Sequence, residues 1–129
     1  MTSKNKIFLD ANMLIEILHK RERSSDVESL MYNLVEKAYI SALTAHLVVH
    51  FTPKGLPMYV VRRFLDDFIV LDLCKDDIEW AFDNKLDDDF EDALQLAIAV
   101  RNGCEEFITL DKQLAETYGR ISRPKIRLL

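Results

Sequence analysis

Five short apolar runs alternate with longer segments of helical periodicity along this chain. The short runs suit buried strands, and the longer segments repeat apolar residues at the three- and four-residue spacing of an amphipathic helix. This alternation is typical of an α/β fold, in which helices cover both faces of a parallel sheet. We predict strands at 6–9, 38–43, 68–73, 106–110 and 125–129, and helices at 12–20, 26–37, 45–51, 58–67, 74–84, 91–103 and 112–119.

Residues that start or stop helices support these boundaries. Thr44 is expected to cap the helix at 45–51, and the prolines and glycine of 53–57 should end it. Gly103 should end the helix at 91–103. Because no internal repeat or flexible linker is visible, we expect a single domain over residues 1–129.

Composition narrows the class of protein. Hydrophobic residues make up 49% of the chain, which is enough for a core, but no apolar run is long enough to cross a bilayer. The polar start "MTSKNK" is no secretory signal, and Cys74 and Cys104 lack the spacing of a metal site. We therefore expect a cytoplasmic protein with no membrane association. Its net charge of −5 disfavours a passive nucleic-acid binder, but it suits an enzyme whose carboxylates surround a divalent metal.

Acidic residues stand where two predicted strands end. In "KNKIFLDANMLIEIL" an apolar run stops at Asp10, and "EFITL" is followed directly by Asp111. The carboxyl ends of parallel strands share one edge of the sheet, and ligands bind at that edge in open α/β folds. Asp10 and Asp111 are therefore candidate site residues.

The segment "DDDFEDALQLAIAV" adds two further acids. Its helix is apolar nearly all round, and Asp92 shares a face with Leu96 and Ala99. A carboxylate on a buried face is costly unless it is paired or binds a cation. Asp89 precedes Asp92 by three residues and could project toward the same region. No equally clear set of basic partners exists, so these acids together favour a hard cation, Mg²⁺ or Mn²⁺, although each acid alone is more simply read as a helix cap.

Four motifs in this order resemble the PIN-domain nucleases, and the resemblance covers nearly the whole chain. They are "FLDANMLIEIL", "YISALTAH", "DFEDALQLAIAV" and "FITLDK". The chain is most similar to VapC-like toxin ribonucleases whose central motif is Asp-Phe-Glu-Asp-Ala. The resemblance implies a three-layer PIN-like fold with about five parallel strands. It also implies a divalent-metal-dependent endoribonuclease, with an RNA substrate, a cognate antitoxin protein and a second copy of the chain as partners.

The resemblance also assigns site residues. It makes Asp10, Asp92 and Asp111 the acids that bind Mg²⁺ or Mn²⁺, and Asp89 an additional acid of the same site. Asn12 and Thr109 are the accompanying polar residues, and they are expected to orient water or phosphate.

One position departs from the family pattern. Many PIN nucleases carry a glutamate early in the helix after the second strand, but here that helix reads "TAHLVVHF". His46 stands near the place, and Leu47 occupies the position given by spacing from Thr44. Two readings stay open: Asp89 supplies the missing charge, or the site is weakened and the chain is a binding module for RNA or protein.

Other classes of function fit less well. A haloacid-dehalogenase-type phosphotransferase needs a second Asp where Asn12 stands, and a phosphoreceiver domain would use Asp72 but lacks its other parts. His46 and His50 have a spacing found in zinc sites but no accompanying signature, and the three histidines are scattered along the chain. The densest basic sets, which are candidate phosphate contacts, are Lys20, Arg21 and Arg23; Arg62 and Arg63; and Arg120, Arg123, Lys125 and Arg127.

Overall fold

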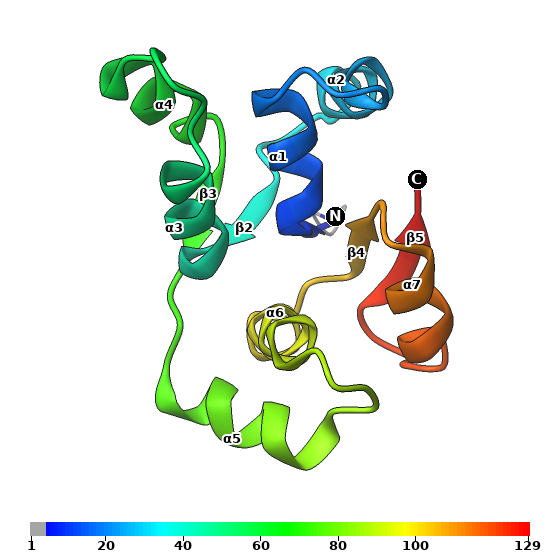
Figure 1. The fold of residues 1–129 in the computed structure, drawn as a ribbon. Helices are drawn as coiled ribbons and strands as arrows, with labels where there is room; N and C mark the ends of the chain where they lie inside the picture. The colour runs from blue at the N-terminus through cyan, green and yellow to red at the C-terminus, as the bar shows by residue number, and fades with distance from the viewer. Residues whose placement is uncertain (1–4) are drawn as a thin grey trace.

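All five predicted strands form in the computed structural model, which describes residues 5–129. They are β1 (Ile7–Leu9), β2 (Tyr39–Ser41), β3 (Ile69–Leu71), β4 (Glu106–Thr109) and β5 (Lys125–Leu128). The strands pair in parallel in the order β3-β2-β1-β4-β5, so β1 is central. Figure 1 shows β2 and β3 on one side of α1 and β4 and β5 on the other. The segments that follow β1, β2 and β4 therefore leave the sheet at one edge, which confirms the predicted α/β fold with a parallel sheet.

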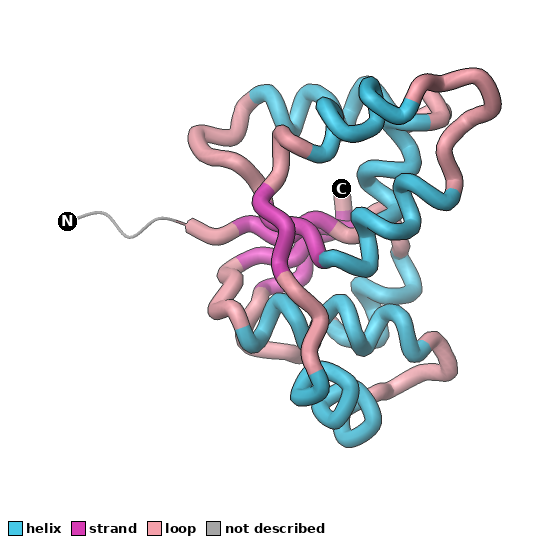
Figure 2. The backbone as a smooth tube through the Cα atoms, turned by 90° about the vertical axis from the view of Figure 1, so that its left-hand side faces the viewer, coloured by secondary structure: helices cyan, strands magenta, loops and turns pink. Residues whose placement is uncertain are grey.

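Helices lie on both sides of the strands, as Figure 2 shows. None of those formed within residues 5–129 is long and apolar enough to span a membrane. They are α1 (Ala11–Leu18), α2 (Ser24–Tyr32), α3 (Ala42–His50), α4 (Met58–Leu65), α5 (Lys75–Asn84), α6 (Phe90–Arg101) and α7 (Lys112–Tyr118).

The two faces of the sheet build two separate cores because successive strand residues point in opposite directions. Leu9 packs with helices α1 to α4, in a core that includes Met13 and Val48. Its neighbour Phe8 points to the other face, where it stacks on Phe107 at 5.2 Å between ring centroids and packs with α6 and α7. The helix α6 is thus held against one face of the sheet, beside the edge where the acids stand.

Two helix boundaries differ from the prediction by three residues or more. Thr44 does not cap α3, because the helix starts at Ala42 and the Ser41 side chain accepts a hydrogen bond from the Thr44 backbone N–H at 3.0 Å. Helix α2 ends at Tyr32 rather than at residue 37, and Val35 in the following turn is fully exposed. Leu34 still packs on the core from outside the helix, so its inward position did not require a longer helix.

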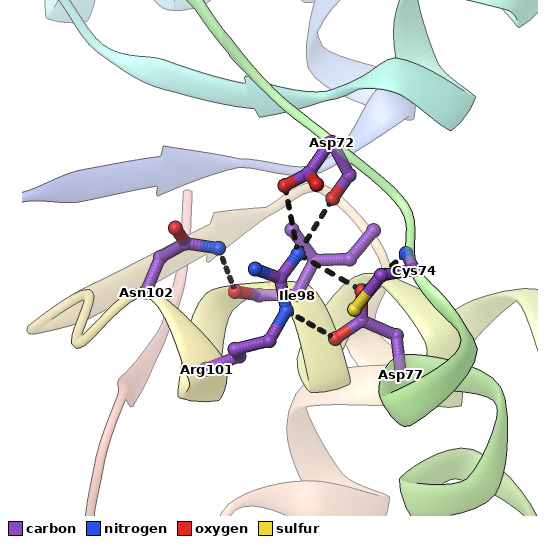
Figure 3. Close-up of polar contacts among 6 residues, drawn as sticks. All are labelled: Asp72, Cys74, Asp77, Ile98, Arg101 and Asn102. Carbon is purple, nitrogen blue, oxygen red and sulfur yellow. Dashed lines mark hydrogen bonds and ion pairs between the residues drawn. The ribbon is translucent and has the colours of Figure 1, made fainter.

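An ion pair between a buried aspartate and a partly exposed arginine joins α5 to the end of α6 (Figure 3). The Arg101 guanidinium donates to both carboxylate oxygens of Asp77, at 2.9 and 3.0 Å, and the Asp77 side chain is only 1% exposed. Arg101 also donates to the carbonyl and carboxylate oxygens of Asp72. Asp77 in turn accepts from the Cys74 backbone N–H at the start of α5. The connection from β3 to α5 is thereby fixed to α6, and Asp72 serves as an ion-pair partner.

Candidate functional site

Asp10 lies at the carboxyl end of β1, beside the carboxyl end of β4. It follows β1 in extended backbone and is the N-cap of α1, with its Oδ1 accepting from the Ala11 backbone N–H at 2.8 Å. Its Oδ2 accepts from the Thr109 hydroxyl at 2.8 Å, at the end of β4. Both oxygens are therefore held, and the residue is buried at 6% exposure.

The Thr109 hydroxyl is the hub of the polar contacts around Asp10. It donates to Asp10 and accepts from the Asn12 side-chain amide at 3.1 Å and from the Asp111 backbone N–H at 2.9 Å. Asn12 Oδ1 in turn accepts from the Leu110 N–H at 3.2 Å. A hydroxyl has one hydrogen and two lone pairs, so all its capacity is used. Thr109 and Asn12 thus hold Asp10 and the start of α7 in place, and their expected role in orienting water or phosphate stays a prediction.

Asp89 and Asp111 are helix caps, as the simpler reading of each residue held. Asp111 Oδ1 accepts from the Gln113 and Leu114 backbone N–H groups at the start of α7, at 2.9 and 3.2 Å. Asp89 Oδ1 accepts from the Glu91 and Asp92 N–H groups at the start of α6, at 3.1 and 3.4 Å. Within residues 5–129 the second oxygen of each carboxylate forms no hydrogen bond. Capping therefore occupies one oxygen and leaves the other able to bind a ligand.

Unlike Asp10, Asp89 and Asp111, Asp92 has no evident role in stabilising the fold. It lies in the first turn of α6, half-buried, and caps nothing within the described residues. Burial, followed by the charges of Asp89, Asp10, Asp87 and Asp111, raises the pKa of Asp92 to about 8. Each of these causes disfavours the charged form of Asp92, and none of them is a cationic side chain.

Asp10 belongs to the same electrostatic cluster. Burial raises the pKa of Asp10 to about 6, although the hydrogen bonds from Thr109 and the Ala11 backbone lower it. The charges of Glu91 and Asp111 raise it further. The fold therefore brings Asp10, Asp92 and Asp111 close enough to repel one another, and this is the condition that a bound divalent cation relieves.

A polar cavity of about 460 Å³ opens beside these acids. Its lining is acidic and does not include Asp10. No three His, Cys, Asp or Glu side chains within residues 5–129 are arranged to hold a metal ion between them. The donors are carboxylate oxygens, which suit Mg²⁺ or Mn²⁺, so the residues fit such an ion in kind. The lining residues are Leu86, Asp87, Asp88, Asp89, Asp92, Asp111 and Gln113.

A neutral network lies at the start of α3, the helix in which many PIN nucleases are expected to carry a glutamate. In α3, His46 is exposed and Leu47 half-buried. Further in, Ser41 and Thr44 are bonded to Gln95 of α6, and all three are fully buried. The sequence analysis did not single out Gln95. A glutamine inside an otherwise apolar helix was the available signal, because a buried amide needs polar partners.

The candidate phosphate contacts do not form one surface. Arg23 and Arg127, from two different basic segments, line one cavity of about 640 Å³ between α2 and β5. Arg23 also pairs with Asp26, which lines the same cavity, at 2.7 Å. Arg62 and Arg63 are exposed on α4. Of the two cavities described here, only this one brings residues of separate basic segments together.

The three histidines are not scattered in space. His46 stacks on His50 with 6.1 Å between ring centroids, and His50 packs edge-on against Phe51. His19 Nε2 lies 2.6 Å from the Phe51 carbonyl oxygen. Two of the histidines thus stack along α3, and His19 contacts the residue that follows this helix.

Comparisons with known proteins agree on one fold. A family model described as PIN domain matches residues 7–120. A chain of a toxin-antitoxin complex from Klebsiella pneumoniae has a TM-score of 0.75 at 21% identity, over 95% of this chain and 96% of that one. A sarcin-ricin-loop-cleaving VapC toxin from Mycobacterium tuberculosis gives 0.68 at 16%, over 91% and 98%. A chain of DNA-bound VapBC from Salmonella typhimurium gives 0.64 at 18%, over 95% and 97%. No curated protein matches the sequence.

Proposed function

Because the chain belongs to the PIN-domain family, we propose that it is a divalent-metal-dependent endoribonuclease and the toxin of a toxin-antitoxin pair. One observation carries the proposal. Asp92, in the first turn of a helix packed on the sheet, lines one polar cavity with Asp89 and Asp111, and burial followed by the charges of neighbouring acids raises its pKa to about 8. Perturbed acids of this kind gather at functional sites, and a divalent cation would relieve their repulsion.

The proposed site uses Asp10, Asp92 and Asp111 as the acids that hold Mg²⁺ or Mn²⁺, with Asp89 as a fourth. When bound, the ion lowers the pKa of water and stabilises negative charge on the scissile phosphate. Thr109 keeps Asp10 in one orientation, because its hydroxyl donates to Oδ2. The same hydroxyl accepts from the Asp111 N–H, so it also fixes where α7 begins.

An antitoxin partner is part of the proposal. A free ribonuclease that cuts cellular RNA needs an inhibitor, and several of the similar structures are toxin complexes with a partner protein. A purified complex whose nuclease activity appears only after removal of the partner would support an inhibitory antitoxin. We assign the activity to one domain over residues 1–129.

A homodimer is also part of the proposal. Helices α3 and α4 and the loop between them expose Val49, Phe51, Met58 and Tyr59, which is a large apolar surface for a small protein. Light scattering on the purified chain should give twice the mass of one copy. A strictly monomeric protein at high concentration would contradict the dimer but not the nuclease.

The decisive experiment is a nuclease assay on antitoxin-free protein. RNA should be cleaved with Mg²⁺ or Mn²⁺, and cleavage should stop with EDTA and in Asp10→Asn and Asp92→Asn. Asn caps a helix about as well as Asp, so Asp10→Asn removes charge while it keeps the start of α1. Metal-independent cleavage, or full activity in both variants, would refute the proposal.

A second candidate function is a binding module with a weakened site. It is favoured by the absence of an acid in the first turns of α3, where Ser41 and Thr44 form a neutral network with Gln95. In that case RNA should bind with similar affinity with and without Mn²⁺, and no cleavage should occur.

A further inference from the structure

Ser41, Thr44 and Gln95 form a neutral network of hydrogen bonds that is shielded from solvent. The Ser41 hydroxyl donates to Gln95 Oε1 at 2.6 Å, and Gln95 Nε2 donates to the Thr44 hydroxyl at 2.8 Å. Ser41 Oγ also accepts from the Thr44 backbone N–H at 3.0 Å. All three residues are 0% exposed, and no buried side-chain polar atom within residues 5–129 lacks a partner. The amide is thus held at both ends by two different hydroxyls.

The network lies next to Asp10 in the sheet. Phe8 of β1 pairs with Tyr39 of β2 in parallel. Two residues further along each strand stand Asp10 and Ser41, which are therefore neighbours at the same edge. Ser41 also caps α3, so its hydroxyl joins the end of β2 to the start of that helix.

Gln95 shares a helix face with Asp92. Residues three apart on an α-helix are neighbours on its surface, so a contact at Gln95 constrains where Asp92 points. Apolar packing of Leu96 and Ile98 holds α6 against the sheet but has no directional preference. Hydrogen bonds do have one, and a buried amide that loses them pays a desolvation cost. The network therefore opposes rotation or sliding of α6.

We propose that Gln95 is a positioning residue that, bonded to Ser41 and Thr44, fixes α6 so that Asp92 faces Asp10. The proposal rests on the nuclease function proposed above. It assigns the hydroxyls of Ser41 and Thr44 a structural role at the start of α3. The neutral network adds no charge to the proposed site but orients one of its acids.

The test compares variants that break the network with variants that spare it. Gln95→Met keeps the length of the side chain and removes both hydrogen bonds. Thr44→Val removes the acceptor at constant shape, whereas Thr44→Ser keeps the hydroxyl. Val48→Ala is the matched control, because Val48 is a fully buried residue of α3 outside the network. Each variant is assayed at a temperature where circular dichroism shows it fully folded.

The expected result is a split between turnover and substrate binding. Gln95→Met and Thr44→Val should lower kcat about 10- to 100-fold, the usual effect of a misplaced catalytic group, with little change in KM. Thr44→Ser and Val48→Ala should keep kcat near the wild-type value. Equal kcat in Gln95→Met, Thr44→Val and Val48→Ala would overturn the proposal.

A second measurement needs neither metal nor substrate. In NMR spectra of the ligand-free chain, the backbone amides of residues 89–92 should shift in Gln95→Met and Thr44→Val and stay in place in Val48→Ala and Thr44→Ser. Unshifted amides in the first two variants would overturn the proposal. If the wild type cleaves no RNA, the nuclease function fails, and this measurement alone decides the positioning role.

Discussion

The ion pair between Arg101 and Asp77 should be the most sensitive polar contact for stability. In Arg101→Met, the carboxylate of Asp77 stays buried at 1% exposure but loses two charge-assisted hydrogen bonds. It keeps only the contacts with Cys74. Removing one partner of a buried ion pair costs about 3–5 kcal/mol, and because the Arg101 side chain is 31% exposed we expect the lower end of this range. For a domain of this size the melting temperature at pH 7 should then fall by roughly 10 °C.

The pH dependence identifies the cause. Burial raises the pKa of Asp77, but the bonds from Arg101 and Cys74 outweigh it and hold that pKa below its usual 3.8. In the wild type, Asp77 therefore adds stability above pH 3.8 and loses it as the pH falls through the lowered pKa. Without Arg101, burial should raise this pKa, so Asp77 destabilises the variant as the pH rises above 3.8. The stability gap should be widest near neutral pH and narrow on acidification.

Urea unfolding at several pH values measures this gap. Asp72→Asn is the matched control, because it removes the other partner of Arg101, which is mostly exposed and should contribute at most about 1 kcal/mol. A loss below about 1 kcal/mol in Arg101→Met at pH 7 would refute the reasoning. So would a larger gap that does not change with pH.

Three further predictions concern the candidate site. Because the pKa of Asp92 is raised to about 8, its charge should destabilise the metal-free fold increasingly from pH 3.8 to 8, so Asp92→Asn should melt like wild type near pH 4 and higher at pH 8. If Asp89 compensates for the absent glutamate, Mn²⁺ titration should show nearly equal loss of affinity in Asp89→Asn and Asp92→Asn; unchanged affinity in Asp89→Asn would reduce that residue to a cap. Arg127→Gln should weaken single-stranded RNA binding and lower its salt slope by about 0.7, whereas Arg62→Gln should not.

The sheet edge could be predicted because it follows from chain direction. Parallel strands must end at the same edge, so Asp10 and Asp111 were expected near each other from their places after two apolar runs. Asp92 joined them because its helix was apolar on most sides and had to be buried. The structure confirms the parallel sheet, and Asp92 and Asp111 line the same cavity.

Contacts between distant segments could not be predicted in the same way. The role of Gln95 depends on Ser41, 54 residues earlier, and no local pattern links them. The hub at Thr109 depends on Asp10 in the same manner, 99 residues apart. Thr44 was assigned as a cap because it suits that position as well as Ser41 does, and only the end of β2 decides between them. Pairing of this kind is a property of the packed structure.

Capping by Asp10, Asp89 and Asp111 has a consequence for how this protein can change over generations. Each of these carboxylates starts a helix, and asparagine starts a helix about as well. At Asp89 and Asp111, where capping uses one oxygen, a single exchange of Asp for Asn can therefore remove charge from the proposed site without loosening the scaffold, whereas at Asp10 it would also disturb the hydrogen bond from Thr109. A lineage with the proposed nuclease site could weaken metal binding at these two caps through intermediates that all stay folded, and each step could be reversed by one substitution.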